Sequence, residues 1–198
     1  MTELLTLINK IKQCHLCDTE LPYSAKPVVQ LDARAKILIA GQAPGLKAHL
    51  SGVPFDDASG QRLRQWLGLS SEQFYDQTQL AILPMGFCFP GSGNSGDLPP
   101  SVRCAATWRA EVLSCLPELE LTIMLGKYAQ DYHLGKSAFT VTSRVKRWQE
   151  TLPQSISLPH PSGRNNIWLK RNPWFEEQVL PALRERVAQV LVKKQFES

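Results

Sequence analysis

The sequence has no apolar run of the roughly 20 residues that a membrane-spanning helix needs, and no apolar segment of signal-peptide type in its opening residues, MTELLTLINKIKQC. It also has no internal repeat and no strong excess of one charge, because 22 Lys and Arg stand against 18 Asp and Glu, a net charge of +4. This mildly basic balance is compatible with a polyanionic partner without requiring one. We therefore expect a monomeric, cytoplasmic protein with one domain over residues 1–198 and no membrane association.

Cysteine is scarce and odd in number, with residues at positions 14, 17, 88, 104 and 115. Thiols stay reduced in the cytoplasm, so spaced cysteines indicate metal or cluster ligation more than disulfides. Cys14 and Cys17 form the closely spaced pair CHLC, and Cys88 and Cys104 are further along the chain. Four thiolates suit a four-iron cluster or zinc equally by ligand count, and Cys88 and Cys104 also fit buried apolar thiols. Cys115 has the pattern of an ordinary helix residue.

Short apolar runs alternate with helical patterns along the whole chain. The predicted strands are 35–41, a segment within 79–91, 120–126 and 155–161. The predicted helices are 4–11, 59–69, 101–116, 127–134 and 174–192. Parallel strands need crossover connections that are usually helical, so this alternation predicts an α/β fold, a three-layer α/β/α sandwich with a central, mainly parallel four-stranded sheet.

Two further local predictions concern the ends of these elements. Ser59 is a plausible cap for the helix over 59–69. The stretch GSGNSGDLPP, from 91 to 100, is too rich in Gly, Ser and Pro to form regular structure.

Two of the predicted strands run into turns that are rich in polar groups. KILIAGQAPG covers 36–45, and SLPHPSGRN covers 157–165. In open α/β sheets, ligands bind beyond the carboxyl ends of the strands. Glycine lets the backbone of such a turn approach a ligand closely. We therefore expect GQAPG and HPSGRN to lie together and to form one binding site.

The chain resembles the uracil-DNA glycosylase superfamily, and within it the iron-sulfur branch called family four. The resemblance covers most of the chain and depends on the order and spacing of GQAPG at 41–45, SGVPF at 51–55 followed by SGQRL, LGKYA at 125–129, HPS at 160–162, and cysteines 14, 17, 88 and 104. It implies a DNA glycosylase that hydrolyses the N-glycosidic bond of a flipped, deaminated or damaged base in DNA repair. It also implies a 4Fe-4S cluster on Cys14, Cys17, Cys88 and Cys104, with zinc as the alternative.

The resemblance further implies a base pocket, made by Gly41, Gln42, Ala43, Phe55 and His160. Phe55 matches the aromatic residue on which the flipped base stacks, although a phenylalanine of the core would look the same in sequence. His160 matches a donor to the base oxygen on which negative charge collects, and a structural histidine at a strand end is the alternative.

The segment after His160 is similar to a loop that enters DNA as the base leaves in related branches. The DNA-binding residues implied in this way are Ser162, Arg164, Asn165, Lys170 and Arg171. Arg164 and Asn165 are the candidates for the wedge. Lys170 and Arg171 fit phosphate contacts, and they also fit the solvated start of a basic helix.

Two residues depart from the family-four pattern. Gln42 stands where that branch has a glutamate, and Pro84 stands where it has an asparagine that reads the uracil edge. An amide can position water but cannot act as a base, and proline has no donor. The expected catalytic residues are therefore Gln42, His160 and Asp57.

The missing carboxylate has three candidates in the flanking loops, namely Asp56, Asp57 and Asp97, each of which also fits a turn or cap. A catalytically weak or inactive member of the same fold that binds nucleic acid or a nucleobase remains the alternative function. The two departures from the family pattern motivate it.

Overall fold

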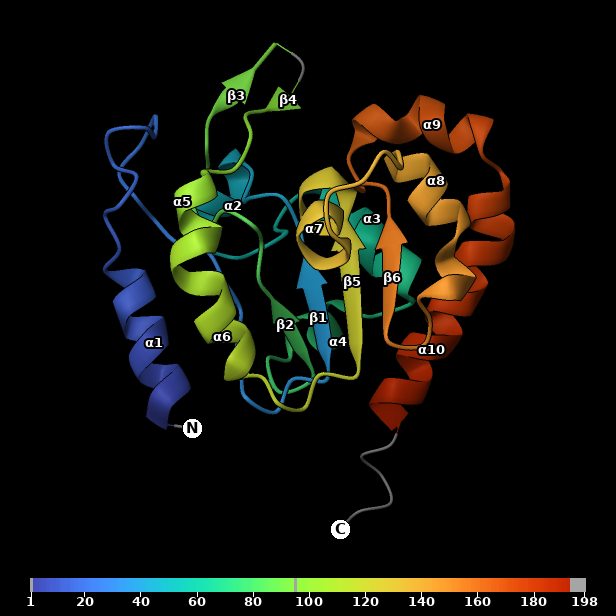
Figure 1. Cartoon of the computed structure of the whole chain (residues 1–198), viewed down its shortest axis with the longest axis horizontal. Coiled ribbons are helices and arrows are strands. Elements are labelled where there is room, and N and C mark those ends of the chain that lie inside the picture. Colours follow the sequence, from blue (N-terminus) through green and yellow to red (C-terminus); the bar gives the residue numbers. More distant parts are fainter. Residues whose placement is uncertain (1, 95, 193–198) are drawn as a thin grey trace.

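The computed structural model describes residues 2–94 and 96–192. Its centre is a four-stranded sheet with the order β2-β1-β5-β6, in which all neighbouring strands are parallel (Figure 1). The strands are β1 (Ile37–Ala40), β2 (Leu80–Ile82), β5 (Leu121–Leu125) and β6 (Ser155–Leu158). The predicted α/β sandwich with a parallel four-stranded sheet is therefore confirmed.

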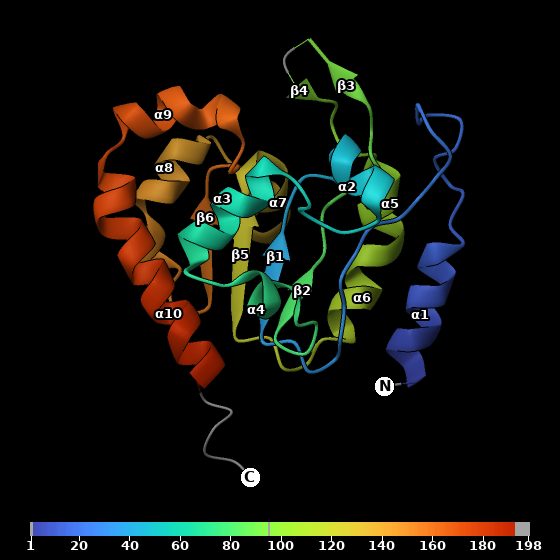
Figure 2. The same ribbon diagram turned by 180° about the vertical axis from the view of Figure 1, so that it is seen from behind.

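Ten α-helices lie in the described part of the chain. They are α1 (Thr2–Lys12), α2 (Leu46–Ser51), α3 (Ala58–Leu67), α4 (Ser71–Tyr75), α5 (Val102–Cys104), α6 (Ala110–Ser114), α7 (Gly126–Leu134), α8 (Val141–Lys146), α9 (Asn166–Arg171) and α10 (Leu180–Val192). Figures 1 and 2 show α6 and α7 over one face of the sheet, and α3 and α4 over the other.

Alternation along the central strand β1 explains the two covered faces. Ile37 and Ile39 pack in the apolar cluster that contains α3, α4 and α10. Leu38 packs with α1 and α6 on the opposite face, and Ala40 packs with α7. Successive side chains of a strand point to opposite faces, so a strand buried on both faces is apolar throughout.

Three predicted elements differ from the structure in their details. The helix over 59–69 begins one residue earlier, and its cap is Asp57, whose Oδ1 accepts a hydrogen bond from the Gly60 backbone N–H at 2.8 Å. The expected cap Ser59 lies inside α3 instead. The helices over 101–116 and 174–192 each contain a π-helical segment, Ala105–Arg109 between α5 and α6 and Phe175–Val179 before α10.

The segment expected to be irregular forms a two-stranded antiparallel hairpin, β3 (Ser92–Gly93) with β4 (Gly96–Asp97). Four short helices, α2, α4, α8 and α9, also lie outside the ranges that the sequence predicted as helical. Each has five or six residues, which is too short to display a helical repeat of apolar positions.

The sheet places its carboxyl edge at the end of the molecule that carries the β3–β4 hairpin, α2 and α9 (Figure 1). No helix among the described residues is both long enough and apolar enough to cross a membrane.

Candidate active site

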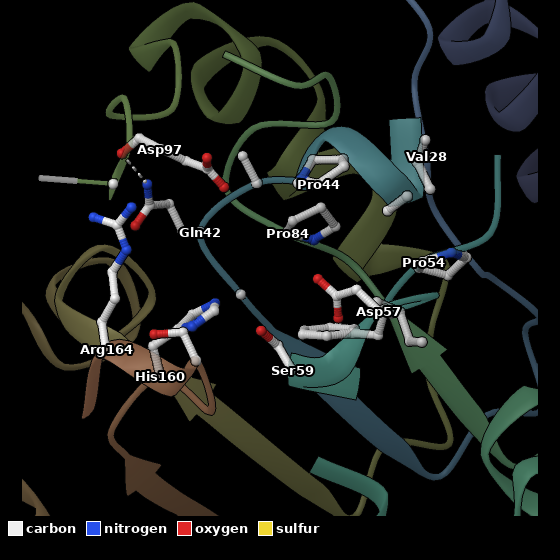
Figure 3. Close-up of a pocket in the computed structure, with 18 of the residues that line it drawn as sticks. Val28, Gln42, Pro44, Pro54, Asp57, Ser59, Pro84, Asp97, His160 and Arg164 are labelled. Atoms are coloured by element: carbon white, nitrogen blue, oxygen red, sulfur yellow. Dashed lines mark hydrogen bonds between the residues drawn. The ribbon is translucent and has the colours of Figure 1, made fainter. Parts of the chain in front are cut away.

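A pocket of about 380 Å³ opens at the carboxyl edge of the sheet (Figure 3). Its volume lies in the range of small-molecule sites, about 300–1,000 Å³. The walls come from the loop after β1, the segment before α3, the β3–β4 hairpin and the loop after β6. The expected site residues in its lining are Gly41, Gln42, Ala43, Phe55, Asp57, His160, Ser162, Arg164 and Asn165. The two strand-end motifs therefore share one pocket, as the sequence predicted.

Phe55 has an unusual backbone that the surrounding residues hold in place. Its φ is +56°, a left-handed conformation that is uncommon for a bulky residue. The Tyr75 hydroxyl donates to its carbonyl at 3.3 Å. A Cβ on Gly60 would lie 1.8 Å from the same carbonyl oxygen, so only glycine fits there. Strained conformations of this kind are held by their surroundings and gather at functional sites.

The Phe55 ring lies against the glycine at the end of β1. Its Cζ is 3.5 Å from the position that a Cβ on Gly41 would occupy. Phe74, which is fully buried, supports the ring edge-on at a centroid distance of 6.2 Å. The half-buried ring is therefore fixed at the wall of the pocket, next to the GQAPG turn.

The side-chain amide of Gln42 donates hydrogen bonds to the end of the hairpin. Its Nε2 donates to the Leu98 carbonyl at 2.9 Å and to the Asp97 carbonyl at 3.4 Å. The amide oxygen is its remaining polar atom, and an amide oxygen accepts hydrogen bonds without acting as a base.

Asp57 combines the cap of α3 with a place in the pocket. Its Oδ1 is the cap acceptor, and its Oδ2 lies 3.8 Å from the position that a Cβ on Gly45 would occupy. The Oδ2 of Asp97 lies 3.6 Å from that same position. Two carboxylates therefore flank the end of the GQAPG turn.

His160 follows β6 and lies half-buried in the pocket. Burial lowers its pKa below the ordinary value, and the carboxylates of Asp57 and Asp97 act in the opposite direction. The ring is therefore neutral at pH 7, with one N–H donor. The Asn165 side chain donates to the His160 carbonyl at 2.6 Å and so holds the loop that carries the ring.

The DNA-binding candidates separate into two groups in the structure. Ser162, Arg164 and Asn165 line the pocket, and the Ser162 carbonyl accepts a hydrogen bond from Arg62 at 3.0 Å. Arg164 is exposed, whereas the Asn165 amide is used inside the loop. Lys170 and Arg171 are exposed on α9 and do not line the pocket.

Sequence reasoning also missed several lining residues, among them Val28, Pro54 and Ser59. Val28 lies in a loop far from either motif and carries no chemical signal, so only the tertiary structure places it. Pro84 lines the pocket where a donor was expected in the family pattern, and its carbonyl accepts a hydrogen bond from the buried Arg109 at 3.0 Å.

The cysteines assigned to ligation gather around a second, smaller pocket. Cys14, Cys17, Cys88 and Cys104 all line it, and all are free. Burial raises the pKa of Cys88 to about 11 and that of Cys104 to about 12, and the neighbouring cysteines add to both shifts. Cys88 and Cys104 are therefore neutral thiols unless a cation draws off their protons.

These thiols fit a four-thiolate group by number, by softness and by their convergence on one cavity. In residues 2–94 and 96–192, no three His, Cys, Asp or Glu side chains stand close enough together to hold a metal ion. Ligation would therefore need the thiols to move toward a common centre. Cys115 lies apart from this pocket, directly after the last residue of α6 rather than within the helix.

Comparisons with known proteins identify similar chains. The chain is 26% identical over 174 residues to the type-4 uracil-DNA glycosylase of Archaeoglobus fulgidus, a match that covers 82% of this chain and 83% of that protein. The solution NMR structure of a candidate uracil DNA glycosylase from Methanosarcina acetivorans is 15% identical, with a TM-score of 0.49, and the match covers 80% of this chain and 94% of that one.

A family model also matches most of the chain. The model of the uracil DNA glycosylase superfamily matches residues 28–184, which include both strand-end motifs and every residue named above as lining the larger pocket. The chain belongs to the uracil DNA glycosylase superfamily.

Proposed function

We propose that this protein is a DNA N-glycosylase, which hydrolyses the bond between a flipped-out, deaminated or damaged base and its deoxyribose. The observation that carries the proposal is the meeting of GQAPG, Phe55 and His160 in one pocket at the carboxyl edge of the sheet. Membership of the superfamily supports the same reaction class.

The pocket supplies the groups that this reaction needs. Cleavage of the bond sends an electron pair to the departing base and leaves positive character on the sugar. Phe55 offers a ring on which a flipped base can stack, a contact worth about 1–3 kcal/mol. The neutral His160 offers an N–H to a base oxygen, which would gain strength as charge builds there. Gly41 and Ala43 would let backbone groups approach the base.

We propose DNA as the substrate and the exposed Arg164 as its contact at the pocket rim. Lys170 and Arg171 extend the basic surface along α9, at the same end of the molecule (Figure 1). Basic side chains of this kind position a duplex through its phosphates without reading sequence.

We further assign Cys14, Cys17, Cys88 and Cys104 to a 4Fe-4S cluster, with zinc as the alternative. When bound, such a group supplies a structural crosslink. It would join the loop after α1 to Cys88 and to α5. The reaction at the larger pocket needs only this chain's own residues and water.

The test is release of free base by the purified protein from single- and double-stranded DNA that contains uracil, hypoxanthine or xanthine. We expect release from at least one substrate in single-turnover conditions, with excess protein over DNA. Release from none of them by protein with its cysteine site loaded would contradict the proposal.

A second candidate function is binding of nucleic acid or a free nucleobase without turnover. Two observations favour it: Pro84 presents no donor to the base, and the Gln42 amide donates to the hairpin rather than into the pocket. A fluorescence binding assay separates the two functions. The second predicts affinity for DNA or a nucleobase together with no base release.

A further inference from the structure

The β3–β4 hairpin lies against both strand-end motifs. From the first motif, Gln42 donates to the carbonyls of Asp97 and Leu98 at the end of the hairpin. From the second, the Nη1 of Arg164 lies 2.8 Å from the position that a Cβ on Gly96 would occupy. Gly96 also has a φ of +136°, which favours glycine. The hairpin is therefore held next to both motifs and forms part of the pocket wall.

This attachment gives the pocket a carboxylate that the first motif does not have. Asp97 ends β4 and lines the pocket, and Figure 3 shows its side chain reaching over the turn toward Pro44. The Ser92 hydroxyl donates to its Oδ1 at 3.0 Å. Its Oδ2 is the atom that lies beside Gly45.

Exposure distinguishes the two carboxylates at this turn. Each uses its Oδ1 as an acceptor, Asp57 from the Gly60 backbone N–H and Asp97 from the Ser92 hydroxyl. Asp57 is half-buried at the start of α3, whereas Asp97 is exposed and stands on a separate hairpin, where it can approach a water that enters with the DNA. The electrostatic effects of Asp57 and Asp97 on His160 place both carboxylates around the same cavity.

We propose that Asp97 is the carboxylate that orients and activates the attacking water, and that Gln42 is a positioning residue that holds Asp97 over the pocket. The inference rests on the proposed glycosylase function. It assigns to the hairpin the role that a glutamate at position 42 has in the family pattern.

The step balances as a hydrolysis. The water oxygen forms a bond to the sugar C1′, while the bond from C1′ to the base nitrogen breaks and its electron pair leaves with the base. Asp97 takes one proton from the attacking water and afterwards releases it to solvent or to the departing base. His160 donates a hydrogen bond to the base oxygen that gains charge.

The first test compares Asp97→Asn with the matched control Asp56→Asn. Asp56 is exposed and lies outside the pocket lining, so its change removes a nearby charge without touching the site. Under single-turnover conditions we expect Asp97→Asn to slow base release about a hundredfold or more, the usual worth of a general base. DNA affinity should stay equal or rise, because one negative charge near the phosphates is lost. The control should keep the wild-type rate.

The second test distinguishes positioning from direct catalysis at Gln42. Gln42→Glu removes the donor to two carbonyl oxygens and places a negative charge beside them, so we expect a slower reaction. Gln42→Ala should slow it as well, and the change should add little in the Asp97→Asn background, because both act through one group. Amide exchange at residues 96–98 should become faster in Gln42→Ala while exchange in β1 and β5 stays unchanged.

The outcomes separate this inference from the proposed function. Asp97→Asn with a near-wild-type rate, or Gln42→Glu with a raised rate, would overturn the inference and leave an active glycosylase. A wild-type protein that releases no base would overturn the proposed function and this inference together.

Discussion

His160 illustrates how a single residue is adjusted for its role. Burial lowers its pKa below the ordinary value, so the ring is neutral near pH 7. The carboxylates of Asp57 and Asp97 act in the opposite direction and make the shift smaller. A neutral donor is suited to a base that becomes negative only as its bond breaks, because the interaction then grows in the transition state.

His160→Ala should therefore slow base release by about a hundredfold or more and leave DNA affinity nearly unchanged. The measurement is a single-turnover rate together with a Kd for DNA that contains the substrate base. Equal losses in rate and affinity would contradict a role in the transition state.

Phe55→Ala should behave differently, since stacking on the base exists before the bond breaks as well as during cleavage. We expect weaker capture of the flipped base, with a loss of affinity at least as large as the loss of rate. A base analogue whose fluorescence changes on unstacking would report this capture directly. An unchanged affinity would place Phe55 in a purely structural role.

At the scale of elements, the backbone of Phe55 packs very closely against the start of α3. The Phe55 carbonyl lies where a side chain at position 60 would be, and Asp57 caps the same helix one turn away. The start of α3 and the strained backbone of Phe55 therefore depend on each other.

Gly60→Ala should destabilise the protein by about 2 kcal/mol or more, because its Cβ would overlap the Phe55 carbonyl. Gly163→Ala is the matched control, since no heavy atom lies within 4 Å of its added Cβ. Denaturant unfolding measures both changes. Equal effects of the two substitutions would show that the close approach at Gly60 relaxes at little cost.

The π-helical segment between α5 and α6 contacts α7 through a buried cation, Arg109. Arg109 ends the π-helical segment between α5 and α6, is fully buried, and has no carboxylate within ion-pair distance among the described residues. It donates to the carbonyls of Leu83 and Pro84 and to the Nε2 of His133 on α7, at 2.8 to 3.0 Å. A guanidinium can only donate, so His133 Nε2 must accept and carry no proton.

Burial, with the charge of Arg109 beside it, lowers the pKa of His133 to about 4 from an ordinary value of 6.5. Between these two values the unfolded chain binds a proton that the folded protein does not. Stability should therefore be unaffected by His133 above pH 6.5 and should fall as the pH decreases toward 4.

His133→Gln should reduce this decrease, because glutamine keeps an acceptor for Arg109 but does not titrate. Melting temperatures measured from pH 7 to pH 4 test the expectation. An identical pH dependence in His133→Gln and the wild type would contradict it.

At the scale of the whole molecule, the cysteine pocket joins segments that are distant in sequence. Cys14 and Cys17 follow α1, Cys88 follows β2, and Cys104 ends α5. The apolar face of α1 packs against α6 and the sheet through Leu4, Leu7 and Ile11. A group held by all four thiols would add a crosslink to this packing.

Anaerobically purified protein should be brown and contain about four irons per chain, the content of a four-thiolate cluster. Cys17→Ser should remove the iron and lower the melting temperature by about 5 °C or more, since 1 kcal/mol corresponds to about 2–4 °C in a chain of this size. Cys115→Ser should keep the iron and have a smaller effect. Stoichiometric zinc without iron would overturn the cluster assignment and favour the alternative metal.

Much of the fold was predictable from local pattern. The strands are short, apolar and bounded by turns, and α1 and α10 show the expected helical character. The cap of α3 was misplaced because Ser59 and Asp57 both suit a cap, and only the observed backbone shows which one meets Gly60 N–H. The hairpin at Ser92–Asp97 was missed because its composition is that of a loop, and its strands have two residues each.

The sequence by itself determined the parallel sheet and the meeting of two motifs, because the alternation of strands and helices places every strand's carboxyl end at one edge. Only the tertiary structure decided how the site is completed. Gln42 and Asp97 are 55 residues apart, and no local pattern relates them. Their contact depends on how a short hairpin folds back over the sheet edge. Contacts of this kind are set by packing and by single hydrogen bonds, which leave no periodic signal in a sequence.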